Sequence, residues 1–520
     1  MSIGYGSVRT EQNRTITAVN SIPNVPAPWV RPAEWTELPV ITPSEQKFAG
    51  LFAVFNDDSN AVSIQCTGAY TVDWGDGTVV NYATTVIANK QYVYSSVAGA
   101  PISRGYKQVV ITVTPQSGQT ITSFALNKIP TQYGTQVTTT AWLDMTISFP
   151  SATQIILSSS GAVIFGYTEQ VKILSHIATF SNSWFQGMGV LQSVSISDTS
   201  TINSMTSMFS GCTSLVNIPS MNTANVTNMG SMFNACSVIQ SIPLFNTQNV
   251  TTMTGMFVGC KNLLSVPLFN TIKVTGFGTI FSGCASLQSV PLFNTSNVLT
   301  FTSAFSACSS LQTVPLFNTA KATAMDGMFN GCSALQSVPL FNTSNATTFS
   351  QTFNGCASIK TIPLLDMSNN TSLQFTFSTC SSLTSMPAIN TTKVTNMSYM
   401  FNGCATLQSI PITNVANVTS FDTAFSGCTS LVSIPTWAVK NTATFTTAFT
   451  NCVNLGSFPV TGINASIGIA NCKLSATSLN SIYTNLSATG TGKTITVTGC
   501  YGAATDTPSI ATAKGWTVTG

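Results

Sequence analysis

The sequence predicts a chain of mixed class: an extended N-terminal arm, a β-sandwich, and a long α/β solenoid that ends in a cap. Three observations predict this order. Residues 1–46 are rich in proline, and apolar and polar residues alternate over residues 47–116. Most of the remaining sequence repeats with a period of 24 residues. An alternation of period two is typical of strands, and a fixed period of 20–50 residues is typical of solenoids.

The chain carries very little charge, which limits its partners. Only 6% of its 520 residues are charged, and the formal net charge is +3. Nucleic-acid binding depends on clustered lysine and arginine, so nucleic acid is not an expected partner. No apolar stretch is long enough to span a bilayer, and the start, MSIGYGSVRTEQNRT, lacks the pattern of a secretory signal. Membrane insertion is therefore not expected.

Residues 1–46 are expected to form an extended docking arm. Their prolines disfavour helix and paired strand. The alternative is a plain linker or disordered tail. Trp29 and Trp35 favour docking, because large apolar side chains are costly to leave in water.

Residues 47–116 read as a β-sandwich. The turn DWGDGT, from Asp73 to Thr78, lies between alternating segments such as AVSIQCTGAYTV and YKQVVITVTP. These features resemble the polycystic-kidney-disease (PKD) type of immunoglobulin-like domain, which implies a spacer or adhesion module. Asp73 and Asp76 are weak candidates for Ca²⁺ ligands, because two carboxylates in a turn usually accept bonds from local backbone amides.

Evenly spaced cysteines mark the repeats of the chain. Phenylalanine stands three residues before each repeat cysteine and proline seven residues after it, and the preceding copy has Met188 in the cysteine position. The solenoid is expected over residues 185–472, with degenerate repeats or an N-terminal cap at 117–184. The repeat cysteines, each 24 residues from the next, are Cys212, Cys236, Cys260, Cys284, Cys308, Cys332, Cys356, Cys380, Cys404, Cys428 and Cys452.

Each repeat is expected to hold one short helix. In residues 394–404 the apolar positions are spaced three, three, one and three apart, which fits one helix face. A brief extended segment follows and ends at Pro411, since proline cannot donate to a strand ladder. The tail, residues 473–520, breaks the period and reads as helix, strand, helix and strand, as expected of a C-terminal cap.

Units such as MFNGCSALQSVPLFNT resemble the BspA-like leucine-rich repeats over about residues 180–472. This resemblance implies a right-handed solenoid with a parallel sheet along one face. It also implies a role in bacterial surface adhesion.

The cysteine series is interpreted as part of the core. Structural zinc needs paired cysteines or cysteine–histidine clusters, but these cysteines are single and His176 is the only histidine. Disulfides between stacked turns are geometrically conceivable, yet equivalent sites give no reason for selective pairing. Buried free thiols that pack as small apolar groups are therefore expected. No catalytic residue, cofactor or metal is expected.

The expected function is non-enzymatic display. Because no secretory signal is expected, the leading hypothesis is a bacteriophage virion protein on the tail or capsid surface. Its arm would bind other virion proteins within a larger assembly, and its solenoid would contact a host-surface glycan or protein. The alternative is a BspA-like adhesin on the bacterial cell surface.

Overall fold

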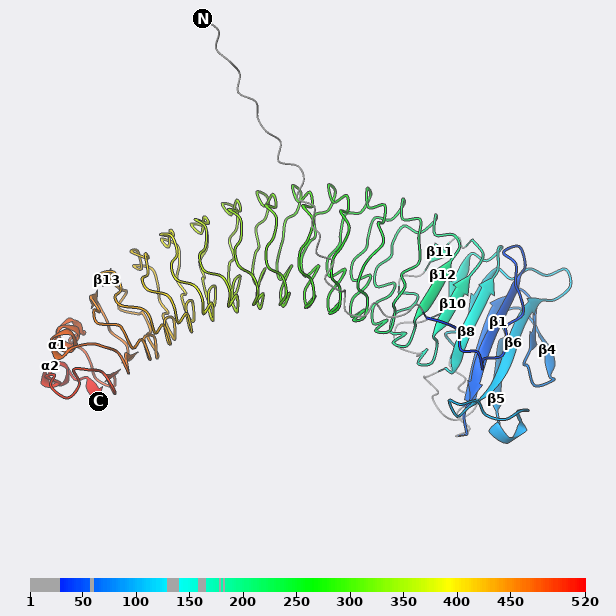
Figure 1. Ribbon diagram of the computed structural model, residues 1–520, viewed down its shortest axis with the longest axis horizontal. Helices are drawn as coiled ribbons and strands as arrows, with labels where there is room; N and C mark the ends of the chain where they lie inside the picture. Colours follow the sequence, from blue (N-terminus) through cyan, green and yellow to red (C-terminus); the bar gives the residue numbers. More distant parts are fainter. Residues whose placement is uncertain (1–28, 57–59, 129–139, 158–164, 177–178, 181–182) are drawn as a thin grey trace, which may run out of the picture.

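The computed structural model describes residues 29–520 apart from 57–59, 129–139, 158–164, 177–178 and 181–182. The chain forms an arched solenoid with a β-sandwich at its N-terminal end and a small cap at its C-terminal end (Figure 1). Most of the predicted arm, residues 1–28, lies outside the described residues.

Two sheets form the N-terminal sandwich and the start of the solenoid. The first has the order β12-β10-β8-β1-β6-β3-β4 and the second β11-β9-β7-β2-β5. Their strands are β1 (Lys47–Val54), β2 (Asn60–Thr67), β3 (Tyr70–Asp73), β4 (Val79–Tyr82), β5 (Ile87–Tyr92), β6 (Lys107–Pro115), β7 (Ser123–Ala125), β8 (Trp142–Ser148), β9 (Gln154–Ile156), β10 (Gln170–Ile173), β11 (Thr179–Phe180) and β12 (Ser193–Ile196), with a 3₁₀ turn at Tyr94–Ser96.

The sheets pass from sandwich to solenoid without a break. β8 pairs antiparallel with β1 on one side and parallel with β10 on the other. β7 does the same between β2 and β9. Antiparallel strands are joined by short turns, whereas stacked solenoid turns place equivalent strands in parallel. The sandwich therefore closes the N-terminal end of the solenoid core, because its strands pair with the first turns.

Residues 29–46 pack against the sheet of their own chain. The Trp35 side chain is buried, and its indole N–H donates to Tyr106 Oη at 3.1 Å. The Trp29 indole donates to Glu169 at 3.0 Å, and the Arg31 guanidinium pairs with Asp144 of β8 at 2.7 Å. The two tryptophans that favoured a docking arm thus find their contacts within the chain.

Between residues 193 and 457, isolated backbone bridges join residues 24 apart, as between Ser204, Asn228 and Thr252. Only β13 (Trp437–Ala438) and β14 (Val460–Thr461) extend these contacts into a paired strand within the last repeats. The expectation of one short helix per repeat is wrong: residues 394–404 are a run of turns.

Backbone conformation explains the absence of repeat helices. Tyr399 and Gly403 have φ values of 58° and 74°, which an α-helix cannot accommodate. Their N–H groups donate to the next turn, at Asp422 and Ser426, instead of to residues four positions earlier. Because alternate amides serve the neighbouring turn, the apolar spacing that resembles a helix face belongs to a stack of turns.

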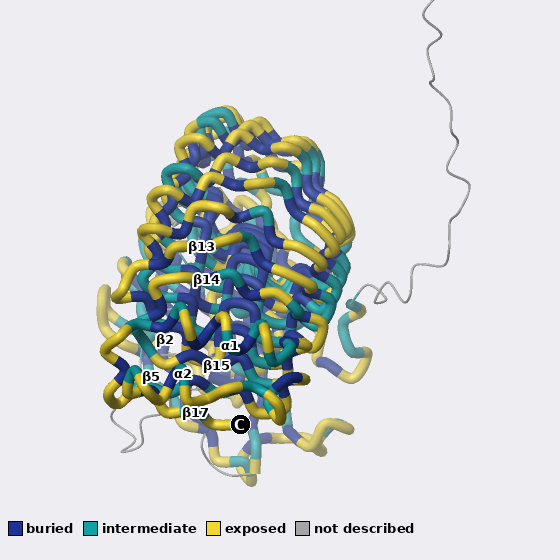
Figure 2. Tube along the Cα trace, turned by 90° about the vertical axis from the view of Figure 1, so that its left-hand side faces the viewer, coloured by how far each residue is buried: buried dark blue, intermediate teal, exposed yellow. Residues whose placement is uncertain are grey.

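The core consists of columns of identical side chains. The phenylalanines three residues before the cysteines stack from Phe185 to Phe449 with ring centroids 5.0–5.9 Å apart. Figure 2 shows the result, with buried residues inside the coil and exposed residues in bands along its flanks. Each turn buries its apolar side chains against both neighbouring turns, which holds the solenoid together.

The C-terminal cap has the predicted order of helix, strand, helix and strand. Its elements are α1 (Ala476–Asn485), β16 (Thr494–Thr496), α2 (Ser509–Thr512) and β17 (Thr517–Thr519), and β16 also pairs with β15 (Ile467–Gly468). Within the described residues, no helix is long and apolar enough to cross a membrane.

Candidate functional site

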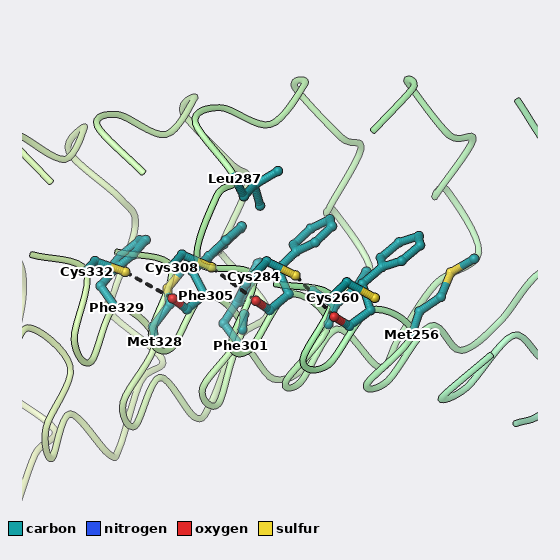
Figure 3. Close-up of a cluster of buried hydrophobic side chains, with 14 of the residues drawn as sticks. Met256, Cys260, Cys284, Leu287, Phe301, Phe305, Cys308, Met328, Phe329 and Cys332 are labelled. Atoms are coloured by element: carbon teal, nitrogen blue, oxygen red, sulfur yellow. Dashed lines mark hydrogen bonds between the residues drawn. The ribbon is translucent and has the colours of Figure 1, made fainter. Parts of the chain in front are cut away.

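The repeat cysteines lie in the core as free thiols. All eleven are fully buried, and each S–H donates to the carbonyl of the phenylalanine one turn earlier, as Cys332 does to Phe305 at 3.0 Å (Figure 3). Burial raises the pKa of Cys332 to about 12. A buried thiol with a raised pKa is a poor nucleophile and a poor metal ligand at neutral pH. This column therefore offers no reactive site.

The two carboxylates of the DWGDGT turn accept hydrogen bonds from residues of the same turn. Asp73 accepts from the N–H of Gly75 at 3.0 Å, and Asp76 accepts from the N–H and hydroxyl of Thr78. Asp76 also pairs with the Lys90 ammonium at 2.6 Å. Burial acts to raise the pKa of Asp76, but the bonds from Lys90 and Thr78 outweigh it, so the pKa is lowered overall. A lysine thus neutralises the carboxylate that the weak Ca²⁺ hypothesis would use.

His176 contacts one acidic residue at the surface. Its Nδ1 lies 2.6 Å from Asp198 Oδ2, and both side chains are partly exposed. Hydrogen bonds from Ser200, and then from His176, lower the pKa of Asp198 to about 2. Among the described residues, no three histidine, cysteine or acidic side chains are grouped to hold a metal ion.

The most unusual surface feature is a row of exposed leucines. The residue after the repeat proline is leucine in six consecutive turns, and its side chain is 60–70% exposed in each. We call this row the leucine ridge: Leu244, Leu268, Leu292, Leu316, Leu340 and Leu364. The same position is Ser220 in the turn before and Ala388 in the turn after, so the ridge has two defined ends.

A tight turn surrounds four of the six ridge leucines. The N–H of Phe293 donates to the C=O of Pro291 at 2.9 Å, which closes a three-residue turn around Leu292. The same bond recurs at Phe317, Phe341 and Leu365. Val290 and Phe293 on either side point into the core, so the leucine between them is left outside.

The step between turns is wide beside the ridge. The phenylalanines that follow its leucines, such as Phe245 and Phe269, have ring centroids 6.4–6.5 Å apart, against 5.0–5.9 Å in the main phenylalanine column. Proline has no N–H to bond the neighbouring turn, which allows the wider step. Three of the five steps along the ridge have this spacing.

The polar columns beside the ridge contain exposed glutamine and serine or threonine. Gln288, Gln312 and Gln336 are exposed four residues after their cysteines. The leucine ridge itself was not predicted. A sequence signal exists, because Val-Pro-Leu-Phe places three large apolar side chains within four residues, and an extended segment can turn only some of them inward.

Comparison with protein families gives one match. The profile described as "Mycoplasma protein of unknown function, DUF285" matches residues 178–289, 262–364 and 348–461, which together cover more than half of the chain. The chain belongs to the DUF285 family. The match begins close to the first turns of the solenoid and stops before its cap. No curated protein sequence matches this DUF285 member at a significant level.

Solved structures similar to this DUF285 protein include three leucine-rich repeat proteins of bacteria. A leucine-rich repeat protein from Bacteroides ovatus is 20% identical, with a TM-score of 0.39, and the match covers 67% of this chain and 91% of that one. A leucine-rich cell surface protein from Faecalibacterium prausnitzii is 19% identical, with a TM-score of 0.31 and coverages of 61% and 90%. A third, from Eubacterium ventriosum, is 14% identical, with a TM-score of 0.30 and coverages of 64% and 91%.

Proposed function

We propose that this protein is a non-enzymatic scaffold displayed on a bacterial cell surface, where it binds a protein partner through the leucine ridge. The exposure of six equivalent leucines in consecutive turns is the observation that supports this proposal. Surface display is proposed from the resemblance of the repeats to BspA-like units. The N-terminal sandwich, which resembles a PKD-type spacer, would hold the solenoid away from its attachment point.

The chemistry of the ridge favours a protein over a glycan. Its exposed groups are aliphatic, and half-buried prolines such as Pro291 lie beside them. Glycan binding needs converging hydrogen-bond donors and acceptors, which an aliphatic row does not supply. A contiguous apolar patch on a soluble protein usually marks a contact with another macromolecule. Full burial of a leucine side chain contributes about 1.5–3 kcal/mol, so even two ridge leucines would matter for affinity.

Few charges surround the ridge. Between residues 240 and 370 the only charged residues are Lys261, Lys273, Lys321, Asp326, Lys360 and Asp366. Lys273 and Lys321 donate to asparagine side chains of the preceding turn at 2.9 and 2.7 Å. The partner surface is therefore expected to be apolar and nearly uncharged, and its binding should depend little on salt.

Photo-crosslinking tests the ridge directly. A photoreactive phenylalanine analogue at position 316 should crosslink to a protein when the chain is expressed in its own organism and irradiated. The matched control is the same analogue at Thr323, which is exposed in the same turn but outside the ridge. Equal crosslinking at both positions, or none at any ridge position, would contradict the proposal.

Substitution measures the contribution of the ridge once a partner is captured. The double variant Leu292→Ser/Leu316→Ser should weaken binding about tenfold or more for each leucine that the partner covers. Its unfolding midpoint should stay close to that of the original chain, because both side chains already face solvent.

Display on a bacteriophage virion, the leading hypothesis from the sequence, is the second setting that we consider, and the ridge would serve equally there. Protease treatment of intact cells, followed by mass spectrometry of the released peptides, separates the settings. Peptides of this chain released from intact cells support the cell surface. Their presence in purified virions and absence from cells would replace the bacterial setting with the viral one.

A further inference from the structure

Two cysteines outside the 24-residue spacing extend the thiol column into the C-terminal cap. The Cys472 thiol donates to the carbonyl of Phe449 at 3.3 Å, and the Cys500 thiol donates to the carbonyl of Ile469 at 3.0 Å. Each acceptor stands three residues before the preceding cysteine of the column, as in the regular repeats. Cys472 and Cys500 are therefore its last two members.

Backbone hydrogen bonds hold these two cysteines side by side. The N–H of Tyr501 donates to the C=O of Cys472 at 3.2 Å. Before the cysteines, the N–H of Asn471 donates to the C=O of Thr498. After them, the N–H of Gly502 donates to the C=O of Leu474. Segments paired in this way lie about 4.8 Å apart. Disulfides join residues whose Cα atoms are about 4.4–6.8 Å apart, so the backbone spacing suits a bridge.

The pair also differs from the regular column in reactivity. The eleven repeat cysteines are completely buried, whereas Cys472 and Cys500 are 2% and 7% exposed, and the adjoining Tyr501 is 82% exposed. The closeness of the two thiols lowers the pKa of Cys500 and raises that of Cys472. All fourteen cysteines lie in the described residues, and among them only Cys500 has a lowered pKa.

We propose that Cys472 and Cys500 form a reversible disulfide that fastens the C-terminal cap to the last turn of the solenoid. The loop between them carries α1, so the bond would close the cap around this helix. The inference does not depend on the leucine ridge or on its partner.

The oxidant in this proposal is a small disulfide such as glutathione disulfide. The Cys500 thiolate attacks one of its sulfurs, which forms a mixed disulfide and releases one glutathione thiolate that takes up a proton. Cys472 then loses its proton to solvent and attacks the Cys500 sulfur, which releases the second glutathione. Two protein thiols are oxidised to one disulfide, and one glutathione disulfide is reduced to two glutathiones.

Peptide mapping of the full chain tests the bond. The reduced protein is treated with glutathione disulfide, denatured, alkylated and digested with trypsin. Cleavage at Lys440, Lys473, Lys493 and Lys514 places the two cysteines on separate peptides, 441–473 and 494–514. These peptides should be joined, and twelve of the fourteen cysteines should be alkylated. Fragmentation of the joined peptides distinguishes Cys472 from Cys452, which shares its peptide.

Two variants complete the test. Cys500→Ser should abolish the joined peptides, whereas Cys332→Ser, a change in the regular column, should leave them unchanged. Alkylation of all fourteen cysteines after oxidation would overturn the proposal, as would joining of neighbouring column members such as Cys308 and Cys332. Should Cys500→Ser not fold, the map of the unsubstituted chain decides the question alone.

Discussion

Buried threonines connect neighbouring turns at the residue scale. The hydroxyl of Thr295 donates to the carbonyl of Asn318, one turn onward, at 2.9 Å. Equivalent bonds form at Thr199, Thr223, Thr247, Thr271, Thr319 and Thr391. Thr343 occupies the same position, but its buried hydroxyl has no hydrogen-bond partner among the described residues. This column of threonines thus contains members whose hydroxyl is hydrogen-bonded, such as Thr295, and one whose hydroxyl is not, Thr343.

The first prediction compares these two versions. Thr295→Val should lower the free energy of unfolding by about 1–2 kcal/mol, because it removes the hydrogen bond that the buried Thr295 hydroxyl donates to the carbonyl of Asn318. Thr343→Val replaces a hydroxyl that makes no bond, so its effect should be near zero or stabilising. Urea unfolding of both variants measures the difference. Equal losses in the two would show that packing, and not the hydrogen bond, matters at this position.

The second prediction concerns the ion pair beneath the arm. Asp144 is 2% exposed, and its pKa is raised by burial although Arg31 acts to lower it. Arg31→Met should lower the free energy of unfolding by about 3–5 kcal/mol at neutral pH, because it leaves a buried carboxylate unpaired. The exposed Glu37 also pairs with Arg31, and Glu37→Gln should cost less than about 1 kcal/mol.

The pH dependence of the Arg31 variant has a definite sign. A raised pKa means that folded Asp144 binds a proton more tightly than the unfolded chain does. The variant should therefore regain stability as the pH falls below the folded pKa, where the buried carboxyl becomes neutral. Urea unfolding at pH 7 and pH 5 checks this, and a loss that is the same at both pH values would contradict it.

At the scale of the element, the sign of φ makes each repeat a run of turns. Positive φ recurs one residue before the cysteine, as at Gly331, and five residues before it, as at Gln351. The first of these positions is glycine in seven of the eleven cysteine-containing copies, since glycine adopts positive φ without steric cost. The copies with alanine, threonine or asparagine there, including Ala307 and Thr379, also have positive φ. The bonds between turns impose this conformation on residues that do not favour it.

The third prediction tests this conformation. Gly331 has a φ of 76°, and an added Cβ would make only ordinary contacts with Ala307. Gly331→Ala should therefore lower the free energy of unfolding by about 1 kcal/mol through backbone strain alone. Gly456 has open space around it and no positive φ, so Gly456→Ala should be neutral or stabilise by about 0.4–1 kcal/mol. Thermal unfolding should show a lower midpoint for Gly331→Ala and an equal or higher midpoint for Gly456→Ala.

At the scale of the whole molecule, each turn contacts mainly the turns beside it. The sandwich closes one end of the column and the cap closes the other (Figure 1). In such an array the stability is close to a sum over turns and their interfaces. The chain should therefore tolerate the loss of a whole turn, but not a shift of register between neighbouring turns.

The fourth prediction follows from that difference. Deletion of residues 285–308 removes one complete period and places Ser309 directly after Cys284, which restores every column. This variant should fold and unfold cooperatively at a slightly lower temperature. Deletion of residues 285–296 removes half a period and puts polar side chains in core positions, so it should aggregate or unfold. Size-exclusion chromatography and thermal unfolding distinguish the outcomes, and equal behaviour of both deletions would contradict the stacked core.

The sequence by itself determined the period, the columns of phenylalanine and cysteine, and the order of elements in the cap, because identical residues at a fixed spacing must stack on one another. It could not decide between helix and turn, since the same apolar spacing serves both and the choice lies in hydrogen bonds between turns. Nor could it show that Trp29 and Trp35 contact their own chain. Only the tertiary structure decided which apolar residue of Val-Pro-Leu-Phe stays outside: the core takes up valine and phenylalanine from both sides, and the leucine between them faces the solvent and forms the ridge.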